Sequence, residues 1–319
     1  MFDIDGIIPI IPTPFTPAEE IDWEALDELI EFAIAGDAWG VCLPAYASEF
    51  YKLSEEERRQ VVARAVAAAK GRVPVIAQAN QPAARHAAAL AVAGQKAGAS
   101  AIAVAIPRQF TIPEAGILRY LATILEAIEV PLIVQDFNPG GTSISPQFIA
   151  DLHRLFPHFR YVKLEEPLLA AKIEAVREAT NGEVGVIEGW GGMYILELIP
   201  AGSCGVMPSL GLVDLLARIY RLLKEKRMVE AYEVFQGVLP QIVYSLYNME
   251  LYHHAEKRLL EDRGVLRTVS VRSAGWPLEA REENHIRFLN SRVLALLDRL
   301  GMPRNPAGNK GSDRSARAT

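Results

Sequence analysis

The stretch Phe159-Arg160-Tyr161-Val162-Lys163-Leu164-Glu165-Glu166 carries one lysine inside a short run of apolar residues. The apolar residues around the lysine predict a buried strand, and the lysine stands near the carboxyl end of that strand. Because an ammonium group is strongly hydrated, a lysine is rarely buried without a reason. Two alternatives stay open. Lys163 can extend its ammonium group into solvent at the strand end, or it can pair with Glu165 or Glu166.

Short apolar runs recur on both sides of this stretch, and a segment of helical periodicity separates each run from the next. The predicted strands lie within residues 6–15, 39–44, 73–78, 101–106, 131–136, 159–166, 184–188 and 204–207. Strands that are apolar throughout are buried on both faces, as in parallel sheets. Eight such units predict an α/β fold, a (β/α)8 TIM barrel, more than an open doubly wound sheet. The open sheet would need a glycine-rich dinucleotide fingerprint after its first strand, and the sequence has none there.

The chain after the last predicted strand is helical by pattern, over residues 212–225, 228–246, 250–260 and 279–300. This is more helix than the last unit of a barrel requires, so we expect additional C-terminal helices packed against the barrel. We predict a barrel over residues 1–225 and a helical extension over 226–303. Residues 304–319 have almost no large apolar side chains and are predicted to form a disordered tail.

The composition is that of an ordinary globular protein, with 50% hydrophobic and 23% charged residues among 319. The net charge of -6 argues against a nucleic-acid partner, and no apolar run approaches the length of a membrane span. Cys42 and Cys204 lie far apart in apolar segments, which predicts core thiols in a reducing compartment. Residues 1–5 include two acids and no basic residue, so we expect no signal peptide and a cytoplasmic protein. The histidines show no metal-ligand spacing, and we expect neither a metal nor a cofactor.

The lysine of the opening stretch is the first candidate for chemistry. Active sites of (β/α)8 barrels lie at the carboxyl ends of the strands, which is where Lys163 stands in the sixth predicted strand. A lysine held among barrel side chains is desolvated, and desolvation favours the neutral amine. A neutral amine adds to a ketone to form a Schiff base, whose iminium draws electrons from neighbouring bonds.

Several segments occur in an informative order and spacing, although none of them is specific alone. They are residues 6–15, 45–49, 53–57, 73–77, 97–99, 131–133, 162–163 and 201–207. In these segments the chain resembles the pyruvate-dependent class I aldolase superfamily, which contains dihydrodipicolinate synthase and N-acetylneuraminate lyase. The resemblance implies that Lys163 is the Schiff-base lysine and that the substrate is a small 2-oxo acid. It also implies a barrel with a C-terminal helical bundle in a homo-oligomer, a tetramer or a dimer.

The loop after the second strand departs from the family pattern. The family normally has Gly-Thr-Thr-Gly-Glu or Gly-Ser-Thr-Gly-Glu, whose hydroxyls and backbone amides hold the 2-oxo carboxylate. Here the loop reads Ala45-Tyr46-Ala47-Ser48-Glu49, and only the glutamate matches. We predict that Ala47 and Ser48 contact the substrate, with Ser48 offering a hydroxyl at a different position. Tyr46 is a candidate catalytic residue whose phenol replaces that of a missing family tyrosine; alternatively it only packs.

That missing tyrosine normally belongs to a Tyr-Asn-x-Pro run after the fifth strand, where it relays protons. Here the run is Gln135-Asp136-Phe137-Asn138-Pro139, so Asp136 or Phe137 takes the tyrosine position, depending on how the two runs are paired. We predict that Asp136 acts as the general acid and base. Alternatively, Asp136 caps a loop or pairs with Lys163 or Arg108.

Three further residues complete the predicted substrate contacts. Arg108, after the fourth strand, is predicted to bind an acidic group of the substrate, because arginine prefers bidentate contacts with anions. Its alternative is a solvated loop arginine. Gly189 and Val206, after the seventh strand and at the end of the eighth, are the other two.

These observations predict a Schiff-base-forming lyase, of aldolase or dehydratase type, that acts on pyruvate or a 3-deoxy-2-oxo sugar acid. Lys163 is the predicted nucleophile and Asp136 the predicted proton-transfer group. The alternative is a non-catalytic or regulatory paralogue that binds a small carboxylic acid, which the lost tyrosine and hydroxyls favour. A third possibility is a barrel enzyme that uses Lys163 as a general base without a covalent step.

Overall fold

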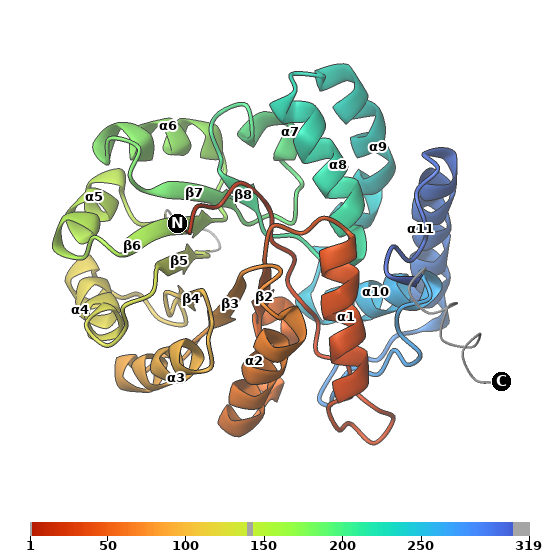
Figure 1. The fold of residues 1–319 in the computed structure, drawn as a ribbon, viewed down its shortest axis with the longest axis horizontal. Helices are drawn as coiled ribbons and strands as arrows, with labels where there is room; N and C mark the ends of the chain where they lie inside the picture. Colours follow the sequence, from red (N-terminus) through yellow and green to blue (C-terminus); the bar gives the residue numbers. More distant parts are fainter. Residues whose placement is uncertain (1, 139–142, 309–319) are drawn as a thin grey trace.

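Eight parallel strands form the centre of the molecule, and helices follow them on the outside of the sheet (Figure 1). The structure is a computed structural model that describes residues 2–138 and 143–308, so Pro139 of the strand-five motif lies outside it. The strands are β1 Gly6–Ile7, β2 Val41–Leu43, β3 Val75–Gln78, β4 Ala101–Ala105, β5 Leu132–Asp136, β6 Phe159–Leu164, β7 Gly185–Glu188 and β8 Gly205–Val206.

The sheet closes on itself. Its strand order is β1-β8-β7-β6-β5-β4-β3-β2, and Ile10, just after β1, forms parallel bridges to both Cys42 and Ser209. The Ile11 backbone N–H also donates to the Cys42 carbonyl at 3.0 Å. These contacts join the first strand to the second as well as to the eighth. The prediction of a (β/α)8 TIM barrel is therefore confirmed.

Three of the barrel helices begin after a residue whose side chain caps them. Asp22, Ser54 and Ser145 each accept a hydrogen bond from the first turn of the helix that follows, and Ser54 and Glu57 form a capping box. The barrel helices are α1 Trp23–Ala35, α2 Glu55–Ala69, α3 Ala84–Lys96, α4 Glu114–Leu125, α5 Pro146–Leu155, α6 Leu169–Ala179, α7 Ile195–Leu198 and α8 Val213–Lys224. Short 3-10 turns are η1 Tyr46–Ser48, η2 Phe50–Lys52 and η3 Leu210–Leu212.

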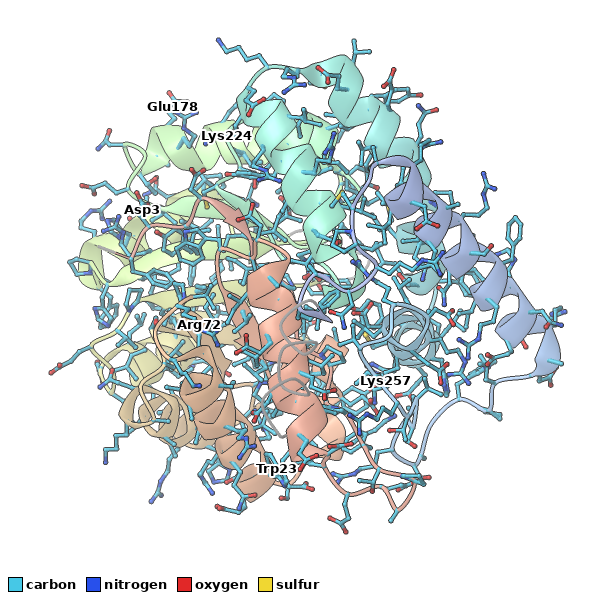
Figure 2. All side chains as sticks on the ribbon, turned by 45° about the vertical axis from the view of Figure 1, so that its right-hand side comes forward. Asp3, Trp23, Arg72, Glu178, Lys224 and Lys257 are labelled. Carbon is cyan, nitrogen blue, oxygen red and sulfur yellow. The ribbon has the colours of Figure 1, made fainter. Side chains whose placement is uncertain are left out.

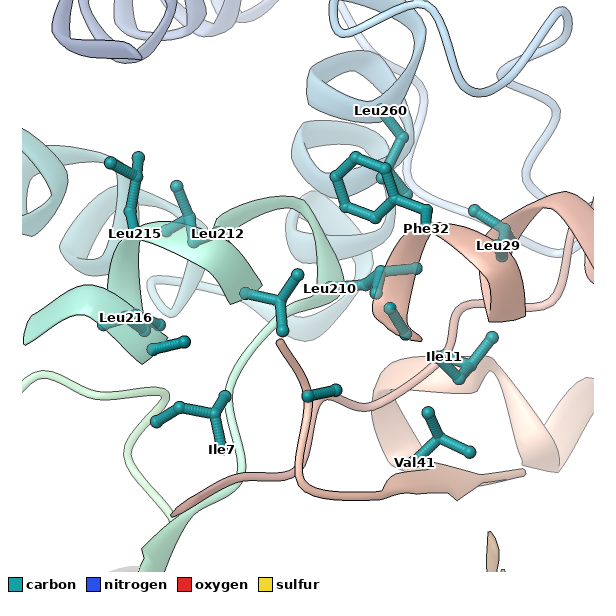
Figure 3. Packing of buried hydrophobic residues seen from close by; sticks show 14 of the residues in the cluster. Ile7, Ile11, Leu29, Phe32, Val41, Leu210, Leu212, Leu215, Leu216 and Leu260 are labelled. Atoms are coloured by element: carbon teal, nitrogen blue, oxygen red, sulfur yellow. The ribbon is translucent and has the colours of Figure 1, made fainter. Parts of the chain in front are cut away.

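Alternate residues of each strand face different cores. An inner cluster fills the barrel and includes Ile133 and Tyr161, whereas Val134 and Val162 belong to an outer cluster against the helices. A second outer cluster joins strand residues to α1, η3 and α10, and Figure 3 shows its side chains meeting between these elements. Strands with two buried faces read as continuous apolar runs, which is the pattern the sequence shows.

Additional helices follow the barrel, as predicted. They are α9 Met228–Ser245, α10 Met249–Asp262 and α11 Ala280–Arg299, and they gather on the side of the barrel that carries α1 and α8 (Figure 1). Residues 304–308, the start of the predicted tail, are held in place: the Arg263 guanidinium donates to the Arg304 carbonyl at 2.6 Å. Residues 309–319 lie outside the described residues. The boundary between residues 225 and 226 stays a prediction.

Candidate active site at the carboxyl ends of the barrel strands

Lys163 lies in the barrel interior near the carboxyl end of β6. Its Cα is in register with Gln135 on β5 and with Ile187 on β7, and Ile187 belongs to the inner cluster. Residues that are paired in a parallel sheet share a face, so the lysine points inward. Its side chain is 10% exposed. The extension of Lys163 into solvent is therefore not observed.

The ammonium group of Lys163 pairs with Glu165, one of the two partners left open by the sequence. Lys163 Nζ lies 3.0 Å from Glu165 Oε1, and the same oxygen accepts a hydrogen bond from Gln135 Nε2 at 2.8 Å. Gln135 Oε1 in turn accepts from Gln78 Nε2 at 2.8 Å. A continuous polar chain thus crosses the barrel from β3 through β5 to the lysine.

Asn80 is a fifth polar side chain, and it extends this row beyond Gln78. Asn80 Oδ1 accepts from Gln78 Nε2 at 3.2 Å and from the Ala105 backbone N–H at 2.7 Å. These two contacts orient the amide, and its Nδ2 is a buried donor with no hydrogen-bond partner among the described residues. A buried unpartnered donor is costly unless an acceptor arrives, so this amide is suited to a polar ligand.

Gly189 makes room for Glu165. A Cβ on Gly189 would come within 2.6 Å of Glu165 Oε1 and within 2.9 Å of its Cδ. Any side chain at residue 189 would therefore displace the carboxylate that pairs with Lys163. The prediction that Gly189 contacts the substrate is untested, and the observed contact is with Glu165.

Asp136 and Arg108 bind each other. Asp136 is in register with Leu164, so it faces the helices and not the barrel interior that holds Lys163. Arg108 donates from Nε to Asp136 Oδ1 at 2.9 Å and from Nη2 to Oδ2 at 2.7 Å. The Ile144 backbone N–H also donates to Oδ2, at 2.7 Å. The pairing of Asp136 with Arg108 is one of the alternatives that the sequence left open for Asp136. The geometry gives no support to proton transfer by Asp136 or to substrate binding by Arg108, because each group is occupied by the other.

The Ser48 hydroxyl is also occupied. Ser48 is fully buried; its Oγ donates to the Ile11 carbonyl at 2.5 Å and accepts from the Ala45 N–H at 3.0 Å. The hydroxyl predicted to contact the substrate therefore shapes its own loop. Ala47 packs against the inner cluster, and its predicted contact with the substrate stays a prediction.

Tyr46 lies at the barrel mouth near Glu165. Its ring makes an edge contact with Phe50, with 4.9 Å between ring centroids. Burial raises the pKa of the Tyr46 phenol, and the negative charge of Glu165 raises that pKa further. The phenol therefore stays protonated at neutral pH and can donate a hydrogen bond. Both the packing role and the polar role predicted for Tyr46 are compatible with this position.

Val206 and Glu188 face away from the barrel interior. The Val206 side chain belongs to the outer cluster, so it points away from the barrel interior that holds Lys163. Glu188 is in register with Leu164, and burial raises the pKa of its carboxyl to about 7. Glu188 Oε2 accepts from the Gly192 N–H at 2.9 Å. Glu188 thus holds the loop that follows β7.

The family-matching glutamate of the strand-two loop is a structural anchor. Glu49 is fully buried, and its Oε1 lies 2.6 Å from Nζ of Lys257, which is 1% exposed. Its Oε2 lies 3.2 Å from Lys52 Nζ and accepts from the Arg272 N–H at 3.2 Å. Lys257 lies on α10, close to the barrel (Figure 2). The C-terminal helices therefore hold the loop that carries Tyr46.

The sequence did not single out some of these residues. Glu165 was named only as a partner for Lys163, and Gln78, Gln135 and Lys257 were not proposed for any role. The Lys-x-Glu spacing was an available signal, because residues two apart in extended chain share a face. No sequence signal places Lys257 beside Glu49, since 208 residues separate them.

Two absences apply to the described residues. In residues 2–138 and 143–308, no group of three or more histidine, cysteine, aspartate or glutamate side chains is arranged to hold a metal ion. Within those same ranges, no helix has both the length and the apolar character to cross a membrane.

Comparisons with known proteins show which family the chain resembles. Residues 3–291 match the dihydrodipicolinate synthetase family. The chain is 29% identical over 265 residues to L-2-keto-3-deoxyarabonate dehydratase of Azospirillum brasilense, a match that covers 82% of this chain and 85% of the relative. It is 28% identical over 246 residues to 4-hydroxy-tetrahydrodipicolinate synthase of Methanopyrus kandleri, covering 75% and 80% of the two chains.

A solved structure shares the fold. Dihydrodipicolinate synthase from Rhodopseudomonas palustris superposes with a TM-score of 0.84 at 24% identity, over 91% of this chain and 97% of the other. The family match extends from the start of the barrel into α11, and it includes both Lys163 and Glu165. The chain therefore belongs to the dihydrodipicolinate synthetase family.

Proposed function

We propose that the protein is a Schiff-base-forming lyase, of aldolase or dehydratase type, that acts on a 2-oxo acid with Lys163 as its nucleophile. The observation that carries the proposal is the inward position of Lys163, 3.0 Å from a carboxylate at the mouth of a (β/α)8 barrel. Active sites of this fold lie at that end of the strands. The dehydratase and synthase names of the relatives support the same class of chemistry.

The chemistry begins with the Lys163 amine. It adds to the C2 carbonyl carbon of the oxo acid, and loss of water gives an iminium. The iminium withdraws electrons, so a proton on C3 becomes acidic and a bond at C4 can break. The substrate carboxylate is held, in this proposal, by backbone N–H groups at the start of η1, because the first amides of a helical turn have no internal acceptor.

Borohydride trapping tests the proposal. The protein is incubated with pyruvate, reduced, and weighed intact; a covalent adduct is expected on the wild type and not on Lys163→Ala. Lys172→Ala is the matched control. Lys172 lies on α6, is partly buried and pairs with Glu166 at 3.2 Å. That variant should form the adduct normally.

Two outcomes would contradict the proposal for pyruvate: no adduct on the wild type, or an adduct that persists on Lys163→Ala. Binding of an oxo acid without an adduct or turnover, and with unchanged affinity in Lys163→Ala, would favour the non-catalytic paralogue. Turnover without an adduct would favour Lys163 as a general base. The homo-oligomer and the cytoplasmic location stay predictions.

A further inference from the structure

A cavity of about 710 Å³ lies between α8, α9 and α11, among the helices that follow the last strand. α9 packs against both of its neighbours, and α11 runs beside it (Figure 1). None of the residues that line the cavity belongs to the barrel-mouth site around Lys163. Small-molecule sites commonly have volumes of roughly 300–1,000 Å³, so this cavity is large enough for a metabolite.

α9 and α11 pass the cavity in opposite directions. A Cβ on Gly237 of α9 would come within 2.7 Å of Leu296 Cδ2 on α11, so the two helices approach closely at this point. Further along α9, Tyr244 contacts His285 of α11, with 4.5 Å between ring centroids. The residue numbers rise along α9 while they fall along α11, so the helices are antiparallel. Gln241, after Gly237, therefore lies toward the first half of α11.

Two buried polar atoms in the lining have no hydrogen-bond partner within residues 2–138 and 143–308. Gln241 is 4% exposed and has an unpartnered Oε1, and Arg218 on α8 has an unpartnered Nε. A buried donor or acceptor that stays unpaired is costly, so both atoms are suited to a polar ligand. Gln241 Oε1 needs a donor, such as a hydroxyl, and Arg218 Nε needs an acceptor, such as a phosphate oxygen.

Three arginines give the cavity an excess of positive charge. They are Arg218, Arg292 and Arg299. None of the three forms an ion pair with the part of the chain that the structure describes. Of the two carboxylates in the lining, Glu230 is bound by Arg227 at 2.7 and 2.6 Å, which leaves only Glu233 to offset the arginines. The cavity therefore suits an anion, and the fork of donors on a guanidinium matches a phosphate group.

An aromatic ring lies beside these charges. Phe288 lines the same cavity one turn before Arg292, and it is 58% exposed. Arg299 is two further turns along α11, about 10 Å from Arg292 along the helix axis. Side chains on a helix lean toward its N-terminus, so both guanidinium groups extend in the direction of Phe288. An exposed ring next to arginines offers a surface on which a planar group can stack.

We propose that this cavity binds a nucleoside 5′-monophosphate. The base stacks on Phe288, a ribose hydroxyl donates to Gln241 Oε1, and the phosphate accepts from Arg218. Arg292 and Arg299 add positive charge around the phosphate. The site involves neither Lys163 nor a Schiff base, so the proposal stands or falls separately from the proposed function.

Isothermal titration calorimetry of the full chain with AMP tests this site. AMP should bind the wild type at one site per chain, and no saturable binding at millimolar concentrations would overturn the proposal. Adenosine and ribose 5-phosphate each lack one group that the cavity contacts, so each should bind at least about tenfold more weakly than AMP. Adenosine as tight as AMP would overturn the role of the arginines, and ribose 5-phosphate as tight as AMP would overturn the stacking on Phe288.

Arg292→Ala removes one charge at an exposed position, so the fold should tolerate it. The variant should bind AMP about tenfold more weakly or worse, as expected for the loss of a charged partner. Arg281→Ala is the matched control on the same helix, because the Arg281 side chain is 87% exposed and does not line the cavity. It should bind AMP like the wild type. Equal AMP affinity in the two variants would overturn the proposal.

The ribose contact has its own test. The wild type should bind 2′,3′-dideoxy-AMP about fivefold more weakly than AMP, because the analogue has no hydroxyl for Gln241 Oε1. Gln241→Leu keeps a similar volume without the acceptor, so it should bind the two nucleotides equally. Equal affinities of the two nucleotides for the wild type would overturn this contact.

Lys163→Ala locates the nucleotide. Because the cavity shares no lining residue with the barrel-mouth site, this variant should bind AMP with the affinity of the wild type. Loss of AMP binding in Lys163→Ala would place the nucleotide at the barrel mouth and overturn the proposal. Failure of pyruvate trapping, in contrast, would overturn the proposed function and leave the nucleotide site standing.

Discussion

At the scale of single residues, the direction of each side chain on its strand decides which carboxylate reaches Lys163. Strand residues alternate between the two faces of the sheet. Glu165 follows Lys163 by two positions and pairs with it, whereas Asp136 lies beside Gln135 in sequence and faces the other way. The residue predicted as the proton carrier is thus separated from the lysine by the sheet itself.

Asp136→Asn should destabilise the protein and leave the rate of proton transfer close to that of the wild type. The substitution leaves the Arg108 guanidinium, 17% exposed, without its bidentate carboxylate, and breaking such a buried pair costs about 3–5 kcal/mol. We expect a loss near the lower end of that range in urea unfolding. Exchange of pyruvate methyl protons in D2O by the folded variant, followed by NMR, should stay close to wild type, and a loss of about 100-fold would return the catalytic role to Asp136.

Gly189→Ala should reduce the rate of proton transfer, and it should also destabilise the protein, because it disturbs the buried pair of Glu165 with Lys163. The new Cβ would lie within 2.6 Å of Glu165 Oε1, so the carboxylate must move away from Lys163. Displacement by about 1 Å can cost a catalytic group about 100-fold in rate. Gly308→Ala is the control, because its nearest neighbour is at an ordinary contact distance of 3.6 Å and far along the chain from β7. Equal rates of pyruvate proton exchange in Gly189→Ala and Gly308→Ala would contradict the role of Gly189 in leaving space for Glu165.

At the scale of elements, α10 and the strand-two loop form one unit through Glu49 and Lys257. Both side chains are buried, and Lys257 also lies over the Phe15 ring at 4.6 Å from its centroid. Glu49 has a left-handed backbone conformation, with φ of 59°, which an ordinary residue adopts only when its surroundings enforce it. The ion pair provides that constraint at the base of the loop that presents Tyr46.

Lys257→Met should therefore be strongly destabilising, by about 3–5 kcal/mol, because it leaves the Glu49 carboxylate buried without its closest cation. Adding Glu49→Gln should restore part of the loss, since the double variant has no uncompensated charge. Lys224→Met removes an exposed pair with Asp5 and should cost less than about 1 kcal/mol. Urea unfolding of the three proteins measures these differences; equal losses in the two single variants would contradict the anchoring role.

At the scale of the whole molecule, one buried histidine should shape the pH dependence of stability. Burial lowers the pKa of His253 to about 3, and the nearby Lys257 ammonium lowers it as well. An unfolded histidine titrates near 6.5, so the unfolded chain binds a proton that the folded chain refuses between these two values. The contribution of neutral His253 to the free energy of unfolding is fully present above pH 6.5 and is lost as the pH falls toward 3.

Replacing His253 by glutamine should make the free energy of unfolding depend less on pH below pH 6.5. The free energy of unfolding of wild type should fall more steeply between pH 6.5 and pH 4 than that of His253→Gln, measured by urea unfolding at each pH. His285→Gln, at an exposed histidine of α11, should keep the wild-type slope. Identical slopes in all three proteins would show that His253 does not control acid stability.

The sequence alone predicted most of the fold, because local patterns carry that information. Eight apolar runs separated by helical periodicity indicated the barrel, whose eight strands the structure shows. The bounds of the C-terminal helices also lie within two residues of the predicted ones, for instance Met228–Ser245 against 228–246. Lys163 was likewise chosen from the sequence, since a lysine stands out in a buried strand.

Only the tertiary structure decided what surrounds that lysine. The register of β5 against β6 places Gln135 beside Lys163 and turns Asp136 outward, and a shift of one residue would exchange the two faces. The contacts of Glu49 with Lys257 and of Gly189 with Glu165 likewise join distant parts of the chain. Such contacts depend on how the strands close and how the C-terminal helices pack, and no local pattern of residues records either of them.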